Sequence, residues 1–147
     1  ACVDGSLSVE LVTKFFGLLD LKAHEFFAGR GMTSNLLSLA CDQVNAAGPA
    51  SISETDTKIK FASWNKCVGQ NFASRSNFSA ALFYFTSGIA FLGQDCWLMD
   101  HTMCLELHRG AIFSSFALGE AEIFDAYANE VIVNVPFEDT IEVQEII

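Results

Sequence analysis

The spacing of apolar residues along the chain predicts a protein built mainly from helices. In residues 8–27, apolar side chains recur every three or four positions, which places them on one face of a helix. Residues 29–31 (Gly-Arg-Gly) end this pattern, and a second helix is predicted to follow. Gly48 and Pro49 mark its end, because glycine tolerates the left-handed backbone of a helix terminus and proline cannot continue a helix.

The segment Phe78–Gly93 is apolar on nearly every face, which is typical of a helix at the centre of a bundle or in a membrane. Its 16 residues fall short of the ~20 that span a bilayer, so we expect a buried central helix and disfavour a membrane span. Three other helices are predicted, over residues 53–72, 95–116 and 120–130. The second of these is expected to be interrupted at Gly110.

The last residues of the chain differ in character from the rest. Residues 131–135 and 140–143 are rich in β-branched side chains and alternate apolar with polar positions, around a turn at residues 136–139. The sequence therefore predicts an all-α fold: residues 1–130 form a compact bundle of about five or six helices around the Phe-rich segment. Residues 131–147 are expected to form a short extended or hairpin β tail. The expected core consists of Leu18, Leu37, Trp64, Val68, Phe72, Leu82, Phe85, Phe91 and Phe116.

Charge is distributed unevenly along the chain. The formal net charge is −10, and residues 120–147 contain eight acidic residues with no Lys or Arg. The first 119 residues hold ten acidic against eight basic side chains, so the body is nearly neutral. This distribution disfavours nucleic acid as a partner, because binding phosphates requires Lys and Arg.

The cysteines are widely spaced and form no C-x-x-C pair: Cys2, Cys41, Cys67, Cys96 and Cys104. This spacing indicates structural disulfides in a secreted chain, and we expect two disulfides among the last four. Cys96 and Cys104 cannot bond within one straight helix, because eight residues rise ~12 Å. They pair with each other only if a turn separates them, and otherwise with Cys41 and Cys67.

Two features accompany the secreted, extracellular interpretation. The odd number of cysteines leaves one unpaired, and Cys2 is the candidate for an intermolecular bond. Asn77-Phe78-Ser79 is a candidate N-glycosylation sequon with Asn77 as the acceptor.

The strongest local pattern of chemical groups is the spacing of His101, Cys104 and His108. Positions i, i+3 and i+7 lie on one face of a helix, so two imidazoles and one sulfur form a weak candidate for a zinc or copper site. We favour the alternative, in which Cys104 belongs to a disulfide and both histidines are partly exposed helix residues. No metal and no cofactor are therefore expected, and the chain is not expected to be an enzyme, because no catalytic motif such as G-x-S-x-G is present.

The favoured functional prediction is a secreted, non-enzymatic structural or self-assembly protein, a homo-oligomer or the partner of another secreted protein. A strand edge pairs readily with another chain, and ionised carboxylates oppose this pairing, so the acidic tail is expected to make assembly sensitive to pH. The tail residues expected to carry this effect are Glu138, Asp139, Glu142 and Glu145. The segment Tyr127–Val131 is similar to part of the helical terminal domains of silk proteins, a likeness of five residues that assigns no family.

The alternative prediction is a small helical carrier of an apolar ligand, such as a lipid or an odorant. The spacing of 26 between Cys41 and Cys67 resembles that of disulfide-linked insect odorant-binding proteins, although the closely spaced second and third cysteines of that pattern are absent. The Phe-rich helix faces would then line a ligand cavity.

Overall fold

The structure of the protein is a computed structural model that describes residues 31–136, with side chains from Leu37 onward. Regular structure in these residues is entirely helical, which confirms the predicted class. The elements are α2 (Gly31–Ala47), the 3-10 helix η1 (Pro49–Ser51), α3 (Thr55–Ser74), α4 (Phe78–Leu92), α5 (Cys96–Met99), α6 (His101–Leu118) and α7 (Ala121–Asn134). The helix predicted over residues 8–27 lies outside the described residues.

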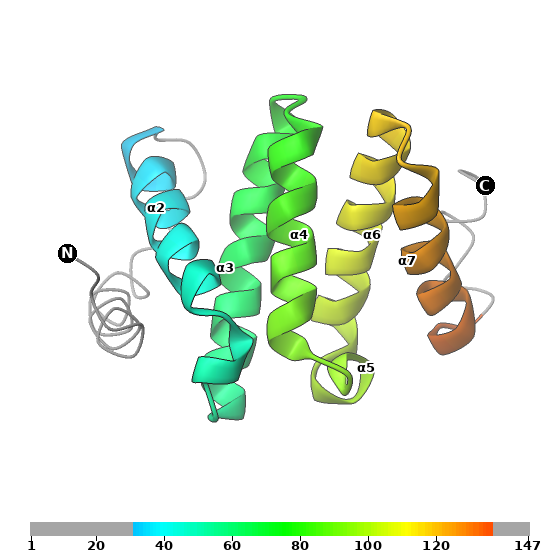
Figure 1. Cartoon of the computed structure of the whole chain (residues 1–147), viewed down its shortest axis with the longest axis horizontal. Helices are drawn as coiled ribbons and strands as arrows, with labels where there is room; N and C mark the ends of the chain where they lie inside the picture. The colour runs from blue at the N-terminus through cyan, green and yellow to red at the C-terminus, as the bar shows by residue number, and fades with distance from the viewer. Residues whose placement is uncertain (1–30, 137–147) are drawn as a thin grey trace.

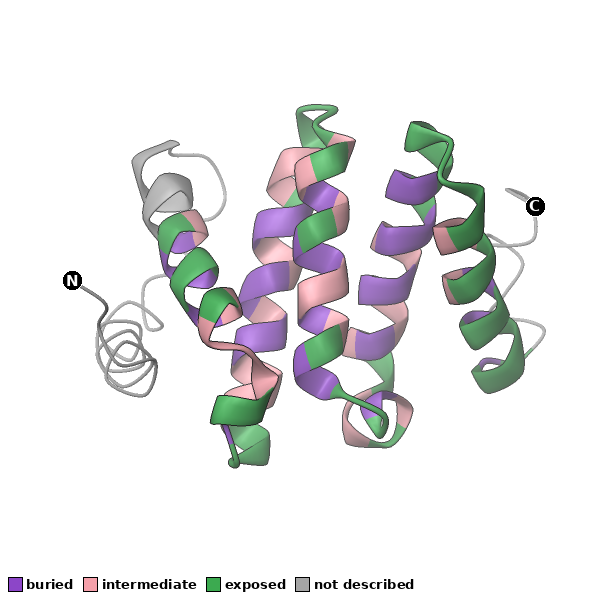
Figure 2. Cartoon of the chain, viewed as in Figure 1, coloured by how far each residue is buried: buried purple, intermediate pink, exposed green. Residues whose placement is uncertain are grey.

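The long helices stand side by side in a row, in the order in which they follow along the chain (Figure 1). Helix α4 packs on α3 on one side and on α6 on the other, as predicted for the Phe-rich segment. Helices α2 and α7 lie at the two ends of the row, where α2 packs mainly on α3 and α7 mainly on α6. The buried faces point towards the middle of the row, and α7 is exposed over most of its surface (Figure 2).

The helix boundaries follow from local chemistry at two positions. Gly48 has a φ of +82°, a backbone conformation that favours glycine, and it ends α2 as predicted. Asp100 has an extended backbone between α5 and α6, and its side chain accepts a hydrogen bond of 3.0 Å from the Met103 N–H. The break in the predicted helix over 95–116 therefore falls at Asp100. The interruption predicted at Gly110 is wrong, because α6 runs through this residue.

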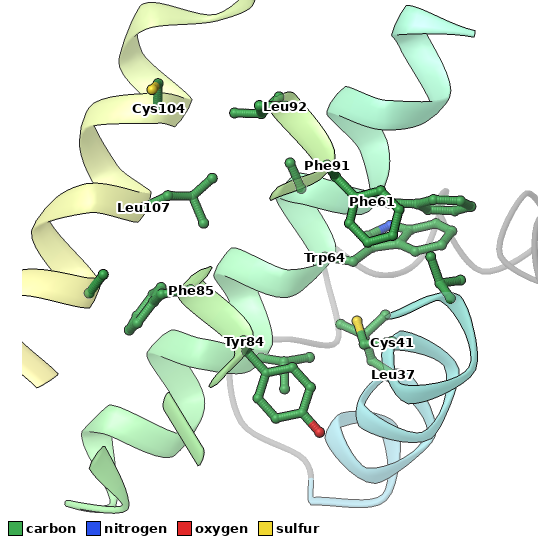
Figure 3. Packing of buried hydrophobic residues seen from close by; sticks show 14 of the residues in the cluster. Leu37, Cys41, Phe61, Trp64, Tyr84, Phe85, Phe91, Leu92, Cys104 and Leu107 are labelled. Carbon is green, nitrogen blue, oxygen red and sulfur yellow. The ribbon is translucent and has the colours of Figure 1, made fainter. Parts of the chain in front are cut away.

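The centre of the core is the Phe85 side chain, which points from α4 towards α6 (Figure 3). A Cβ atom built on Gly69 of α3 would lie 2.9 Å from this ring, and one built on Gly110 of α6 would lie 2.6 Å from it. Glycine at both positions lets the two helices approach the ring. Gly110 therefore allows α6 to pack closely against Phe85 and does not interrupt the helix.

Most of the predicted core is confirmed. The buried members are Leu37, Trp64, Val68, Phe85 and Phe91, while Phe72 and Leu82 are half-buried against them. Phe116 was wrongly assigned, since it is 57% exposed on the outer face of α6. Leu18 lies outside the described residues. Phe61 and Leu107, both fully buried, complete the cluster (Figure 3).

Polar contacts fix α2 to its neighbours. The amides of Asn45 and Asn65 exchange two hydrogen bonds of 2.8 and 3.0 Å between α2 and α3. The Tyr84 hydroxyl of α4 donates to the Asp42 carboxylate of α2. Burial, together with this hydrogen bond, raises the pKa of Tyr84 to about 12, so the phenol stays protonated and continues to donate.

The predicted strand at residues 131–135 is wrong over its first four residues, because α7 continues to Asn134. Val131 is fully buried against Ile112 in a cluster that also contains Ala128 and Val135. These residues repeat at helical spacing, so packing against α6 outweighs the β-propensity of valine. The tail residues Glu138, Asp139, Glu142 and Glu145 lie outside the described residues.

None of the helices in residues 31–136 combines the length and apolar character that crossing a bilayer requires.

Replacing Phe85 by Ala tests the central packing. We expect Phe85→Ala to lower the free energy of unfolding by ~3–5 kcal/mol, because it removes a buried ring and leaves a cavity between two helices. Phe83→Ala is the matched control: it lies in the same helix, its side chain is 52% exposed, and we expect a loss of less than about 1 kcal/mol. Similar losses for the two variants in a denaturant titration would show that Phe85 is not central.

Candidate functional site

The break at Asp100 brings Cys96 and Cys104 together. Cys96 begins α5 and Cys104 lies in the first turn of α6, and their Cα atoms are 5.7 Å apart in a disulfide. The turn that such a pair requires is therefore present. The second predicted disulfide is not formed, since Cys41 of α2 and Cys67 of α3 are free thiols. Burial raises the pKa of both thiols, which favours their protonated form. Cys2 lies outside the described residues.

His108 lies one helical turn after Cys104 and next to the disulfide. Its Nδ1 is 2.7 Å from the Cys104 carbonyl oxygen and 3.6 Å from the Cys104 Sγ. A carbonyl oxygen only accepts, so Nδ1 carries the proton and donates it to this bond. Burial lowers the pKa of His108, which favours the neutral imidazole with its lone pair on Nε2.

The predicted grouping of His101, Cys104 and His108 is not formed. His101 is the first residue of α6; it is exposed and its ring lies 5.4 Å from that of Trp97. Cys96 takes its place, because its Sγ, the Cys104 Sγ and a ring nitrogen of His108 all lie within 4.8 Å of one another. Helical spacing could not reveal Cys96, since the break at Asp100 changes the direction of the chain between the two cysteines.

A ladder of rings extends from the disulfide towards α7. The ring centroids of Trp97 and His108 are 4.8 Å apart, and those of His108 and Tyr127 are 5.5 Å apart in an edge-to-face arrangement. The Trp97 and Tyr127 side chains are half-buried. The three rings connect α5, α6 and α7, and each of the outer two presents part of its surface to solvent.

These rings border a pocket of about 430 Å³ that is open to solvent between α4, α5, α6 and α7. Glu130, exposed and one turn after Tyr127, contributes a carboxylate at its edge. The described residues that line the pocket are Ile89, Ala90, Gly93, Gln94, Cys96, Trp97, His108, Tyr127 and Glu130. Two of these residues, Cys96 and His108, are candidates from the sequence for other roles, but no sequence pattern predicts a pocket between these helices.

A second surface feature lies at the opposite end of α6 from α5, the end that also holds the α3–α4 and α6–α7 connections (Figure 1). Phe113 is 50% exposed and Phe116 57% exposed on α6. Their rings contact Phe78 of α4 and Phe124 of α7, at centroid distances of 5.6 and 6.0 Å. We call these four residues the phenylalanine patch.

The candidate glycosylation site is accessible. Asn77 is exposed between α3 and α4, and its side-chain oxygen accepts a hydrogen bond of 3.3 Å from the Ala80 N–H at the start of α4. This contact caps the helix.

No protein-family model, curated protein or solved structure matches this chain significantly.

The disulfide is open to a direct chemical test. Non-reducing peptide mapping after alkylation in denaturant should recover Cys96 linked to Cys104, with Cys41 and Cys67 alkylated as free thiols. The double variant Cys96→Ala/Cys104→Ala should lose about 2–3 kcal/mol in free energy of unfolding, because the unfolded chain is no longer constrained by this short loop. A linked Cys41–Cys67 peptide, or an unchanged unfolding free energy, would contradict the assignment.

Proposed function

We propose that this chain is a non-enzymatic binding protein for a small, mainly apolar ligand that carries one positively charged group. The observation that carries the proposal is the pocket between α4, α5, α6 and α7. Its volume of about 430 Å³ lies within the range of small-molecule sites. This pocket supports a carrier function, but its described lining contains no Phe, unlike the Phe-lined cavity expected from the sequence.

The apolar part of the ligand is suggested by the side chains that border the pocket. Trp97 and Tyr127 present ring surface, and Ile89 and Ala90 present aliphatic surface. The ring ladder and the disulfide hold α5 and α6 together beside the pocket. Such bracing lowers the cost of ordering the site when a ligand binds.

The charge of the ligand is suggested by Glu130. Its carboxylate lies at the pocket edge, and the described lining contains no Lys or Arg to pair with it. The chain as a whole carries a net charge of −10, which attracts cations. Ring faces also favour an ammonium group, because their centres are electron-rich. These features favour an aromatic amine over an aromatic acid.

The test uses 2-phenylethylamine as the probe and phenylacetate as its acidic counterpart. We expect the amine to change the fluorescence of Trp97 saturably and to bind more tightly than the acid. Glu130→Gln should weaken amine binding about two- to fivefold, the range expected for a solvent-exposed ion pair. Because Trp64 is buried elsewhere in the core, a Trp97→Phe variant should lose the fluorescence response.

A substitution that fills the pocket distinguishes binding of the amine in the pocket from binding elsewhere on the protein. Ala90 is exposed and lines the pocket, so Ala90→Phe should abolish the response without disturbing the fold. Ala126→Phe is the matched control, an exposed alanine of α7 that is not part of the lining. Equal binding by both variants would exclude this pocket as the site.

Self-assembly is the second candidate function, and the phenylalanine patch favours it. Half-exposed rings grouped on one surface are typical of protein interfaces, and a second copy of the chain is the proposed occupant. Glu120, Glu122 and Asp125 of α7 are exposed near Phe124, so like charges oppose the pairing of two copies at low salt. The role proposed for the acidic tail remains a prediction.

Sedimentation velocity tests this second candidate. We expect association to rise with protein concentration and with added salt, because salt screens the repulsion between the acidic copies. The double variant Phe113→Ser/Phe116→Ser should stay monomeric. Leu98→Ser is the control, since Leu98 is 88% exposed in α5 at the other end of α6. A wild-type monomer at every salt concentration would remove the support for assembly.

Secretion is part of the same proposal. The Cys96–Cys104 disulfide supports an oxidising compartment, where disulfides persist. The exposed position of Asn77 is compatible with its glycosylation.

A further inference from the structure

We propose that Cys96, Cys104 and His108 form a redox-controlled zinc site: the disulfide excludes the metal, and its reduction creates two thiolate ligands beside an imidazole. The three side chains lie on α5 and α6, next to the break at Asp100. Their sulfur and nitrogen atoms all lie within 4.8 Å of one another. This inference goes beyond ligand binding and does not depend on it.

The distance between the Cys104 sulfur and the His108 ring nitrogen fits zinc. For bonds of ~2.3 Å to sulfur and ~2.0 Å to nitrogen at a tetrahedral angle, a sulfur and a nitrogen ligand lie about 3.5–3.6 Å apart. The Cys104 Sγ and the His108 Nδ1 are 3.6 Å apart with the disulfide intact. After reduction, the two sulfurs have to separate to about 3.8 Å in a tetrahedral zinc site. The Cys96 Sγ, which lies within 4.8 Å of a ring nitrogen of His108, also has to come to about 3.5 Å from it.

The surroundings allow the metal to enter. Cys96 and His108 both line the pocket, so an ion reaches them from solvent although the side chains themselves are only 3% exposed. Glu130 places a carboxylate at the edge of this path. Three protein ligands leave the fourth zinc position to water from the pocket.

The chemistry balances with a dithiol as the reductant. The dithiol is oxidised to its cyclic disulfide, and its two electrons and two protons convert the Cys96–Cys104 disulfide into two thiols. Zinc then binds as both thiols lose their protons to solvent, which gives two protons released per ion. For Nδ1 to ligate, its proton moves to Nε2, and the hydrogen bond to the Cys104 carbonyl is replaced by the metal bond.

The test must separate this site from the other two described thiols. We therefore use the Cys41→Ser/Cys67→Ser background, reduced with dithiothreitol that is then removed under anaerobic conditions. We expect one Zn²⁺ per chain by native mass spectrometry for the reduced protein and none for the oxidised protein. Added Co²⁺ should show the thiolate-to-metal charge-transfer absorption of a site with cysteine ligands.

The ligand set is tested by two histidine variants in the same reduced background. His108→Gln should weaken zinc binding at least tenfold, whereas His101→Gln should leave it unchanged. Zinc should also raise the melting temperature of the reduced parent but not of its Cys96→Ser/Cys104→Ser derivative, which keeps the readout valid if a variant is less stable.

Three results would overturn the proposal: no zinc bound by the reduced protein, equal zinc affinity with the disulfide intact, or a larger loss for His101→Gln than for His108→Gln. Binding of 2-phenylethylamine is measured on the oxidised protein. Failure of the zinc experiment and failure of the proposed ligand binding therefore remain distinguishable.

Discussion

The arrangement of the helices depends on the contact of one aromatic ring with two glycines. Phe85 of α4 fills the space that side chains at Gly69 and Gly110 would occupy. The backbones of α3 and α6 therefore both pack closely against this one ring. A Cβ atom on Gly88 of α4 would likewise lie 2.7 Å from Leu107 of α6. These glycines let α3 and α6 pack closely against α4, which keeps α4 buried between them. Helices α2 and α7 then pack on the outer sides of α3 and α6.

Within residues 31–136, the packing of the helices leaves parts of their surface accessible. Each terminal helix packs on one main neighbour, so α7 covers only part of α6 and leaves both the pocket and the phenylalanine patch accessible. The pocket is lined by residues of α5 and by His108 in the middle of α6, whereas Phe113 and Phe116 of the patch lie in the last two turns of α6. The two surfaces are thus separate, and occupation of one need not block the other.

The cysteine–histidine cluster depends on a single polar residue. Asp100 accepts a hydrogen bond from Met103 and caps α6, which requires the chain to leave helical geometry just before it. Without this break, eight residues of continuous helix would separate Cys96 from Cys104 by ~12 Å. The disulfide, the position of His108 beside it and the border of the pocket all follow from this local interruption.

The sequence by itself determined the helical class, the end of α2 at Gly48 and the central role of residues 78–92, because apolar periodicity and glycine–proline signals are local properties of the chain. It also showed that pairing of Cys96 with Cys104 requires a turn between them. Only the tertiary structure decided whether that turn exists and which histidine lies beside the sulfurs. The helical conformation of Val131 and the exposure of Phe116 have a related cause. Both depend on which face of α6 packs against α7. Contacts between distant segments decide these features, and no local pattern of residues encodes such contacts.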